Sequence, residues 1–240
     1  DKQRDLIKNF QNGLSPALII LFLIMSLIII QPDYSTAIMI GFLGMLILFI
    51  GGAKISQMLL TCSTALLIGI PVLLSREYRR ERVLSFFGIG DNPDVGYQAH
   101  QSLISLGNGG LFGTGLGNSI EKNHFLPTPH TDFIFAIIGE ELGFLIGTIP
   151  VLTLFLLIFF QGMKIAKNCN DPFGIFLSVG IVSNLILYAF VNAAVVTGLL
   201  PVTGLPMPMV SYGGSGMIIN MSLIGILLNI SQARRPIGDN

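Results

Sequence analysis

The sequence predicts an all-α polytopic membrane protein with about six transmembrane helices, one long extracytoplasmic loop and a re-entrant segment rich in glycine and proline. Three observations lead to this fold class. Hydrophobic residues make up 52% of the 240 residues and charged residues only 11%, whereas a soluble domain carries about 25% charged residues. The mean hydropathy is +0.75. The apolar residues also gather into runs of membrane-spanning length, so we treat residues 1–240 as a single transmembrane domain.

Six apolar runs reach or approach the roughly 20 residues that a helix needs to cross a bilayer with every backbone amide paired internally. They cover residues 14–30, 35–52, 55–74, 133–160, 173–196 and 209–231. The fourth run would extend about 42 Å as one helix at ~1.5 Å per residue. We therefore expect it to tilt, to project beyond the hydrocarbon or to kink at Pro150.

Lysine and arginine residues in the connections predict the orientation of these helices. An even number of helices puts both termini on one side, and the larger basic group lies there: Lys2, Arg4, Lys8, Lys54, Lys164, Lys167, Arg234 and Arg235. The smaller group falls in the single connection 75–132: Arg76, Arg79, Arg80, Arg82 and Lys122. We expect both termini of this chain in the cytoplasm and the connection 75–132 outside.

The start of the chain and its composition narrow the class further. The chain begins with Asp1 and a charged amphipathic stretch, without a visible cleavable signal peptide, and we interpret it as a piece of a longer protein. Only two cysteines are present, Cys62 and Cys169, so we expect no structural disulfide. The formal net charge of zero gives no indication of a nucleic-acid partner.

The long loop contains two recognisable segments. Residues 95–106 have the spacing of an amphipathic helix, which can lie on the outer membrane surface or pack over the other helices. Residues 107–119 contain six glycines but match neither the dinucleotide-binding nor the P-loop spacing. A glycine-rich backbone can still form an anion-binding nest, and the alternative is a flexible linker.

Asp132 lies where the polar loop enters the fourth apolar run. A carboxylate at this place can cap the helix, as aspartate often does, or remain a solvated charge at the rim. It can also act as a general base with a raised pKa, because partial desolvation disfavours the ionised form. Asp33, in the sequence QPD, would lie on the same outer face, although Gln-Pro-Asp is also common in turns.

Glu140 and Glu141 lie inside the fourth apolar run, and ionisable residues in a span are a functional hypothesis by default. At ~100° per residue, Glu140 is about 80° from Asp132 around the helix and Glu141 about 180°. Glu140 could therefore share a cavity with Asp132, while Glu141 should face elsewhere. A structural pairing with a neighbouring helix is an equally good interpretation.

The histidines of the loop do not predict a transition-metal site. His124 and His130 are six residues apart with two prolines between them, and neither they nor His100 show the spacing of zinc ligands. A divalent cation such as Mg²⁺ or Mn²⁺, shared between carboxylates and a substrate phosphate, is compatible with the acidic residues.

The segment 198–216 (GLLPVTGLPMPMVSYGGSG) contains too many prolines and glycines for a continuous helix. Non-helical backbone at membrane depth is stable only where it is buried in protein or lines a wet cavity. We expect this segment, which includes Ser211, to form a re-entrant or extended wall of the outer cavity.

Three motifs together resemble one known family. The stretch GLGNSIEKNHFLPTPHTDFIFAIIGEELGF, with QPDYSTA upstream and LLPVTGLPMPMVSYGGSG downstream, is closely similar to the SEDS family of FtsW, RodA and SpoVE. Members have about ten transmembrane helices, and this chain resembles the last six. The segment YRRERV and the GNS preceding Lys122 favour the FtsW branch, whereas Thr128 stands where the family usually has Glu.

The resemblance implies a peptidoglycan glycosyltransferase that polymerises lipid II on the outer face of the bacterial cytoplasmic membrane, beside a class B penicillin-binding protein. The family's essential aspartate in HTDFIF corresponds to Asp132, and its QPD aspartate to Asp33. Asp132 would accept the proton of the attacking sugar hydroxyl, with inversion at the anomeric carbon and release of undecaprenyl diphosphate. The residues expected to bind substrate are Asp33, Lys122, Arg79, Arg82, His130, Glu140 and Ser211.

Two alternatives remain open at this point. The first is a transporter that flips lipid II, because polar residues in helices and a broken segment are also compatible with transport. The second is a non-catalytic scaffold that recruits the penicillin-binding protein. The sequence also leaves open whether the protein acts in division, elongation or sporulation, and whether it needs a divalent cation.

Overall fold

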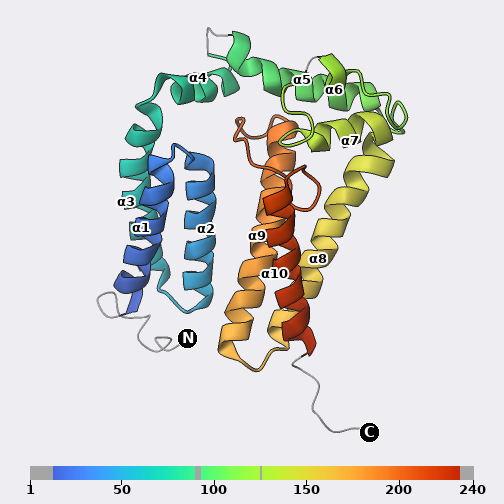
Figure 1. Ribbon diagram of the computed structural model, residues 1–240. Helices are drawn as coiled ribbons and strands as arrows, with labels where there is room; N and C mark the ends of the chain where they lie inside the picture. Colours follow the sequence, from blue (N-terminus) through green and yellow to red (C-terminus); the bar gives the residue numbers. More distant parts are fainter. Residues whose placement is uncertain (1–12, 90–92, 125, 233–240) are drawn as a thin grey trace, which may run out of the picture. The chain divides into compact units, whose positions relative to one another are not determined.

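The computed structural model describes residues 13–89, 93–124 and 126–232, and every regular element within these ranges is a helix. The elements are α1 (Ser15–Ile30), α2 (Tyr34–Ile50), α3 (Ile55–Leu74), α4 (Glu77–Phe86), α5 (Pro93–Gly109), α6 (Glu121–His124), α7 (Ile134–Gly143), the π-helix η2 (Phe144–Thr148), α8 (Ile149–Lys167), α9 (Pro172–Val196) and α10 (Gly214–Gln232) (Figure 1). The predicted all-α class is confirmed.

All six predicted apolar runs are helical over most of their length. Within the described residues, four stretches are long and apolar enough to cross a membrane: Ile55–Leu74, Ile134–Lys167, Pro172–Val196 and Gly214–Gln232. α1 and α2, with 16 and 17 residues, are shorter apolar helices. The last helix begins at Gly214, because the chain forms turns before that residue. The chain is therefore a multi-pass membrane protein, as predicted.

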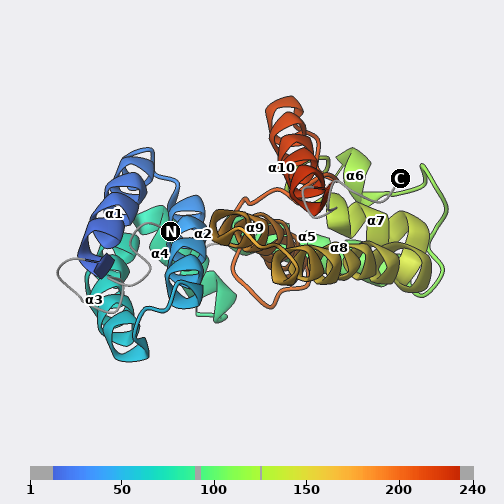
Figure 2. The same cartoon turned by 90° about the horizontal axis from the view of Figure 1, so that it is seen from below.

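Residue contacts divide the chain into two compact units. Unit 1 comprises Asp1–Ser75, Gln161–Asn184 and Gly225–Asn240. In unit 1, α1, α2 and α3 run side by side (Figures 1 and 2). Gly41 and Gly44 of α2 lie against α1, since a Cβ added to either glycine would overlap the side chain of Met25 or Leu21. Small residues of this kind allow membrane helices to approach closely.

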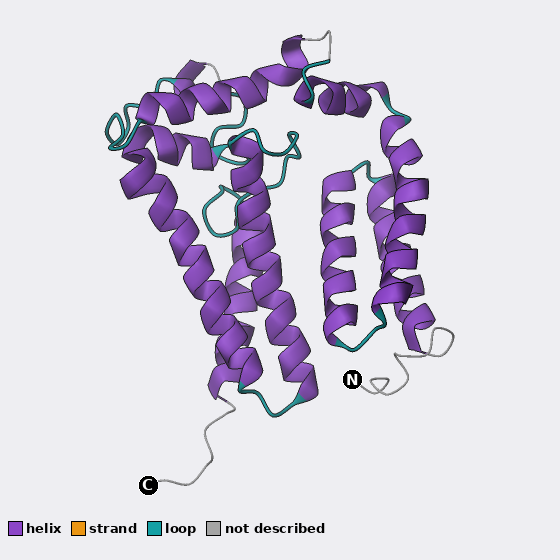
Figure 3. Cartoon of the chain, turned by 180° about the vertical axis from the view of Figure 1, so that it is seen from behind, coloured by secondary structure: helices purple, strands orange, loops and turns teal. Residues whose placement is uncertain are grey.

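Unit 2 comprises Arg76–Phe160 and Leu185–Ile224, and it contains the sharp bend in the fourth predicted run. α7 and the start of α8 run in different directions, joined by η2 (Figure 3). The break lies at Gly143, whose φ of +79° is incompatible with a continuing right-handed helix and favours glycine. The predicted kink at Pro150 is therefore misplaced. Pro150 falls near the start of α8, where a missing N–H is tolerated.

α5 packs on α7 through small residues. Ser102 and Ser105 are fully buried, and a Cβ added to Gly109 of α5 would overlap the backbone of Gly139 in α7. The expected helix at 95–106 is confirmed, and of its two predicted placements the structure shows packing over other helices. The buried side of α5 is small and polar, whereas the apolar side chain of Leu103 is 46% exposed.

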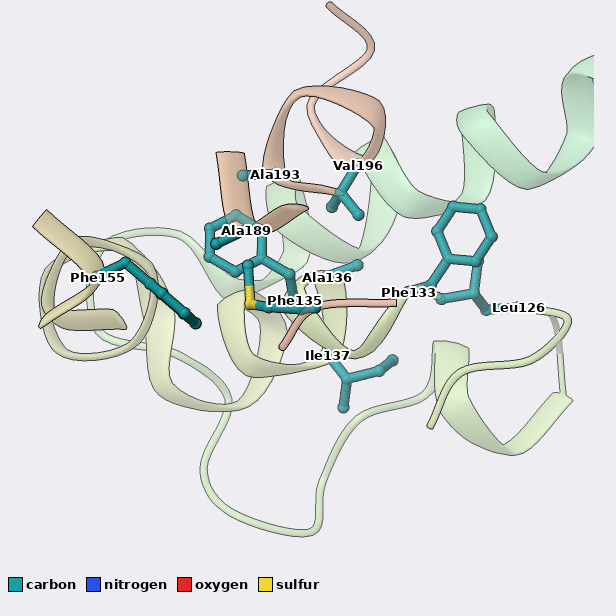
Figure 4. Packing of buried hydrophobic residues seen from close by; sticks show 10 residues of the cluster. Leu126, Phe133, Phe135, Ala136, Ile137, Phe155, Ala189, Ala193 and Val196 are labelled. Carbon is teal, nitrogen blue, oxygen red and sulfur yellow. The ribbon is translucent and has the colours of Figure 1, made fainter. Parts of the chain in front are cut away.

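The main apolar cluster of unit 2 is formed by side chains of α7, α8 and α9 and of the loops next to them. It contains Leu126, Phe133, Phe135, Ala136, Ile137, Phe155, Ala189, Ala193, Val196 and Met207 (Figure 4). Phe133 and Phe135 are each 1% exposed. Because these two aromatic side chains are anchored in the cluster, the start of α7 and the residue before it, Asp132, are held in place.

Candidate active site around Asp132

The carboxylate of Asp132 does not cap α7. The helix begins at Ile134, its N-cap residue is Phe133, and no side chain in the described residues caps it. The capping interpretation of Asp132 is therefore wrong, and its carboxylate remains available for chemistry. Asp33 behaves in the opposite way: its Oδ1 accepts a hydrogen bond of 3.0 Å from the backbone N–H of Thr36 and caps α2.

Four hydrogen bonds connect the backbone of residues 130–132 with the re-entrant segment, two of them through the side chain of Asn192. The Nδ2 group of Asn192 donates both to the carbonyl of Asp132 at 2.6 Å and to the carbonyl of Leu205 at 2.8 Å. Ser211 Oγ donates to the carbonyl of Thr131 at 2.6 Å. The N–H of Tyr212 donates to the carbonyl of His130 at 2.9 Å. These bonds hold the segment against the HTD sequence, as the predicted cavity wall requires.

We call these hydrogen bonds the clamp. The clamp explains where two predicted site residues, Ser211 and His130, lie. Ser211 is only 8% exposed, and its Oγ also accepts a hydrogen bond from the N–H of Met207 at 2.8 Å. Its structural role is thus to position Thr131, and a direct contact with substrate stays a prediction. The imidazole of His130 is exposed beside Asp132, and only its backbone carbonyl takes part in the clamp.

Arg82 of α4 lies at the same site. Its Nη1 donates to the carbonyl of Val202 at 3.1 Å, its Nη2 is hydrogen-bonded to the Tyr78 hydroxyl, and its guanidinium lies 4.5 Å from the centre of the Tyr78 ring. Gly204, with φ +73°, faces Asp132, since a Cβ added to it would stand 3.6 Å from Oδ2. Arg82 and Asp132 therefore lie against the same stretch of the re-entrant segment.

The environment of Asp132 shifts its proton affinity. Burial raises the pKa of the Asp132 carboxyl above its ordinary value, while a hydrogen bond with the Thr131 side chain and the charge of Arg82 offset part of that rise. A raised pKa makes the ionised carboxylate a better proton acceptor than a free aspartate. The raised pKa predicted for a general base at this position agrees with the structure.

Glu140 lies in a separate buried network. It is 0% exposed, and its carboxylate accepts hydrogen bonds from Ser119 Oγ at 2.5 Å, Ser105 Oγ at 3.0 Å and the N–H of Ile120 at 3.0 Å. The neighbouring Glu121 is 5% exposed, and burial together with Glu140 raises the pKa of its carboxyl. Glu140 thus joins α5, α7 and the loop before α6. Because these three donors already occupy the Glu140 carboxylate, the structure does not favour its predicted contact with substrate.

Glu141 and Lys122 form an ion pair with a distance of 2.5 Å between Nζ and Oε1. Both side chains are largely buried, with relative exposures of 13% and 21%. The structural pairing that was one interpretation of Glu141 is therefore observed. Because Lys122 pairs with Glu141, its predicted contact with substrate would require it to exchange this partner.

The glycine-rich loop completes the end of α7. The N–H groups of Thr114 and Gly115 donate to the carbonyls of Glu140 and Glu141 at 2.9 and 3.0 Å. Carbonyls at a helix C-terminus otherwise lack partners, so the loop satisfies them. The anion-nest hypothesis is wrong for these two amides, because they point at helix carbonyls. The linker alternative is also incorrect, since the loop is tied to α7 at both places.

Asp33 and Arg79 complete the set of predicted site residues. Asp33 belongs to unit 1 and Asp132 to unit 2, so a shared face for the two stays a prediction. Arg79, on α4 like Arg82, is half-buried. Among the described residues no group of three His, Cys, Asp or Glu side chains could hold a metal ion. A divalent cation shared between Asp132 and a substrate phosphate stays a prediction.

Two pockets open in unit 2. The first, of about 220 Å³, is lined by Arg82, Ser85 and His100 together with apolar residues of α5 and the segment 198–202. The second, of about 340 Å³, is almost entirely apolar and lies between α5, α7, η2, α8 and α9, with Phe135, Ala194 and Leu199 in its wall. One pocket thus includes a charged side chain, and the other is apolar.

The similarity of the sequence to a known protein family shows what the chain is related to. The family described as cell cycle protein, which comprises FtsW, RodA and SpoVE, matches residues 1–236. This chain belongs to the FtsW/RodA/SpoVE family. The resemblance expected from the three sequence motifs is confirmed.

Individual members of the FtsW/RodA/SpoVE family are similar to most of this chain. A probable peptidoglycan glycosyltransferase FtsW of Geobacter metallireducens is 40% identical over 232 residues, which cover 96% of this chain and 62% of the relative. Stage V sporulation protein E of Bacillus subtilis is 40% identical over 236 residues, covering 98% and 64%. The chain thus spans less than two thirds of these relatives, and the equal identities leave the FtsW branch a prediction.

Solved structures of the FtsW/RodA/SpoVE family share the fold. A chain solved in work on the structural coordination of polymerization and crosslinking by a peptidoglycan synthase complex has a TM-score of 0.75 and 25% identity, over 95% of this chain and 63% of that one. The rod shape determining protein RodA of Thermus thermophilus has a TM-score of 0.61 and 22% identity, over 97% and 62%. The latter comparison supports the fold alone.

Sequence reasoning missed some residues that shape this FtsW/RodA/SpoVE site. Asn192 lies in the long apolar helix α9, and an amide side chain in a span is a signal that could have drawn attention to it. Ser105 and Ser119 surround Glu140, but small hydroxyl residues are too common for their positions to indicate a buried carboxylate.

Proposed function

We propose that this chain carries the catalytic half of a peptidoglycan glycosyltransferase that polymerises lipid II. The observation that supports this most strongly is the placement of Asp132: its carboxylate caps no helix, is partly desolvated, and lies beside Arg82 at the wall formed by the re-entrant segment. The names of the family's curated relatives, which include a probable peptidoglycan glycosyltransferase, support the same activity.

The proposed reaction joins two lipid-linked sugars. The hydroxyl oxygen of one sugar attacks the anomeric carbon of the other, and Asp132 accepts the hydroxyl proton as the new C–O bond forms. The bond from the anomeric carbon to the diphosphate oxygen breaks, and the bond electrons leave with undecaprenyl diphosphate. A single displacement of this kind inverts the anomeric centre. The Arg82 guanidinium is the cation best placed to stabilise charge on the departing diphosphate.

Arg82 provides the first test of this mechanism. In the Arg82→Gln variant we expect polymerisation to fall about 10²-fold, as for the loss of one preorganised donor to a developing negative charge. The acid limb of the pH–rate profile should also move to higher pH, because the charge of Arg82 lowers the pKa of Asp132. Lys164→Gln, which removes an exposed cation from the last turn of α8, is the matched control. An unshifted acid limb would separate Arg82 from Asp132.

The apolar pocket of about 340 Å³ is proposed to hold part of the isoprenoid tail. Filling it by Ala194→Phe should raise the KM for lipid II about tenfold, equivalent to ~1.4 kcal/mol of binding, with a smaller change in kcat. The control is a lipid II analogue with a short tail, for which wild type and variant should have similar KM values. An equal penalty with both substrates would mean that the pocket does not bind the tail.

The proposal extends to location and partner. We propose that the termini of this chain lie in the cytoplasm and that Asp132 faces the extracytoplasmic side of the bacterial inner membrane. A class B penicillin-binding protein is the proposed partner, in keeping with the synthase complex that has a similar fold. A divalent cation such as Mg²⁺ or Mn²⁺ stays a prediction for the substrate-bound state, and no step above depends on it.

The deciding experiment is polymerisation of labelled lipid II by the purified full-length protein with its penicillin-binding partner. Glycan strands resolved on a gel would establish the activity. Movement of lipid II between the leaflets of a liposome without any polymer would instead identify a flippase. Normal recruitment of the partner without polymer or lipid movement would identify a scaffold.

A further inference from the structure

An exposed apolar surface lies where the glycine-rich loop crosses the end of α7. It consists of three loop side chains and three side chains of η2, each between 46% and 77% exposed: Leu111, Phe112, Leu116, Phe144, Leu145 and Ile146. We call this surface the apolar ledge. Contiguous apolar surfaces of this kind mark contact with another apolar phase, either protein or membrane.

Backbone hydrogen bonds hold the loop against η2. The N–H of Phe144 donates to the carbonyl of Gly110 at 2.9 Å, and the N–H of Leu145 donates to the carbonyl of Leu111 at 3.1 Å. Gly143 contributes to the close approach, because a Cβ added to it would stand 2.5 Å from the carbonyl carbon of Phe112. The loop side chains are therefore held beside those of η2.

The ledge continues the lipid-facing surface of a membrane span. η2 is part of the span Ile134–Lys167, and α8 continues it with exposed apolar residues such as Leu154 and Leu157. The sequence contains no Asp, Glu, Lys or Arg from 95 to 120 or from 142 to 163. Moving the ledge into an apolar phase would therefore desolvate no charged side chain of its own.

We propose that the apolar ledge inserts into the interfacial layer of the bilayer, so that lipid rather than a protein partner covers it. The loop has irregular backbone, which is not stable against the hydrocarbon centre, so the acyl-chain boundary is the depth that fits it. This contact anchors the C-terminal end of α7, the helix that begins just after Asp132. The inference rests on the membrane placement of the chain and is independent of the proposed catalysis.

The ledge can be tested with tryptophan, because these 240 residues contain none. Phe112→Trp and Leu116→Trp are prepared separately in the full-length protein in nanodiscs, with any indole outside the 240 residues replaced by phenylalanine. Leu157→Trp reports a lipid-facing position of α8, and Glu77→Trp reports a position whose side chain is 79% exposed and normally charged. Quenching by brominated lipids and by aqueous iodide is measured for each variant.

Quenching of the Phe112→Trp and Leu116→Trp indoles should be strong with lipids brominated near the headgroup and several-fold weaker with iodide than for Glu77→Trp. Lipids brominated deep in the acyl chain should quench Leu157→Trp more than either ledge variant. Iodide quenching equal to that of Glu77→Trp, with no effect of brominated lipid, would overturn the proposal. Protection from iodide that arises only after a penicillin-binding protein is added would also overturn it and assign the ledge to a protein partner.

Discussion

Replacement of Asp132 by asparagine is expected to lower the rate of lipid II polymerisation by about 10²- to 10⁴-fold, the usual contribution of a general base. Asparagine has nearly the same shape but cannot accept the proton of the attacking hydroxyl. Wild-type activity should fall on acidification at a higher pH than an ordinary aspartate would allow, because burial raises the pKa of Asp132 and protonation removes the base. The rate of strand formation measured against pH tests both statements.

The asparagine variant should unfold at the wild-type temperature or slightly above it, since the Asp132 carboxylate caps no helix and burial disfavours its ionised form in the folded state. The matched control is Asp171→Asn, in which the carboxylate that accepts a hydrogen bond from the N–H of Gly174 is replaced by an equally good capping group. We expect the control to keep wild-type stability and activity. Polymer formed at the wild-type rate by Asp132→Asn would remove Asp132 from the mechanism.

Replacement of Asn192 by leucine should have the second largest effect, through the clamp and without removing a reacting group. The two carbonyls that Nδ2 serves, those of Asp132 and Leu205, would lose a buried donor, at a cost of about 1–3 kcal/mol each. Part of this cost is offset, because Asn192 Oδ1 is buried without a partner among the described residues and leucine removes it. A loss of about 2–4 kcal/mol in the free energy of unfolding remains.

Activity of Asn192→Leu should fall about 10- to 100-fold even at temperatures where the variant is folded, because misplacing a catalytic group by 1 Å costs rates of this size. Asn184→Leu offers the matched control: the same substitution, two turns earlier on α9, at a side chain that makes no hydrogen bond in the described structure. Thermal unfolding and strand synthesis are measured for both variants. Equal behaviour of the two would show that the clamp does not hold Asp132.

The sequence predicts much of this molecule because membrane insertion imposes simple rules on it. Apolar runs of the length that spans a bilayer must be helical, and all six predicted runs are helical over most of their length. Asp132 by itself also suits a helix cap or a rim charge, and the similarity of its HTDFIF motif to the FtsW/RodA/SpoVE family is what indicates a candidate base. The expectation that the proline- and glycine-rich segment forms a wall beside it also agrees with the hydrogen bonds of Ser211 and Tyr212.

Other features depend on contacts between residues distant in the chain, and local patterns do not encode them. Asp33 and Asp132 both precede a helix, yet one caps its helix and the other does not, because Phe133 is drawn into the apolar cluster and α7 starts after it. Glu140 looked like a partner for Asp132 by helical angle, but two serines from α5 and the loop surround it. Angles around one helix do not reveal which neighbours supply donors.

The bend in the fourth apolar run also shows the difference between local sequence patterns and tertiary contacts. A kink at Pro150 was one of the three expectations for this run, but Pro150 lies in the first turn of α8, where a proline is tolerated. The bend occurs at Gly143, where the glycine-rich loop approaches so closely that a side chain would collide with its backbone. The sequence by itself determined the class and the spans, since these follow from the cost of polar groups in lipid, and its family resemblance pointed to Asp132 as the candidate base. The partners of each carboxylate and the direction of α7 were decided by tertiary packing, because only there do the donors and the free space become defined.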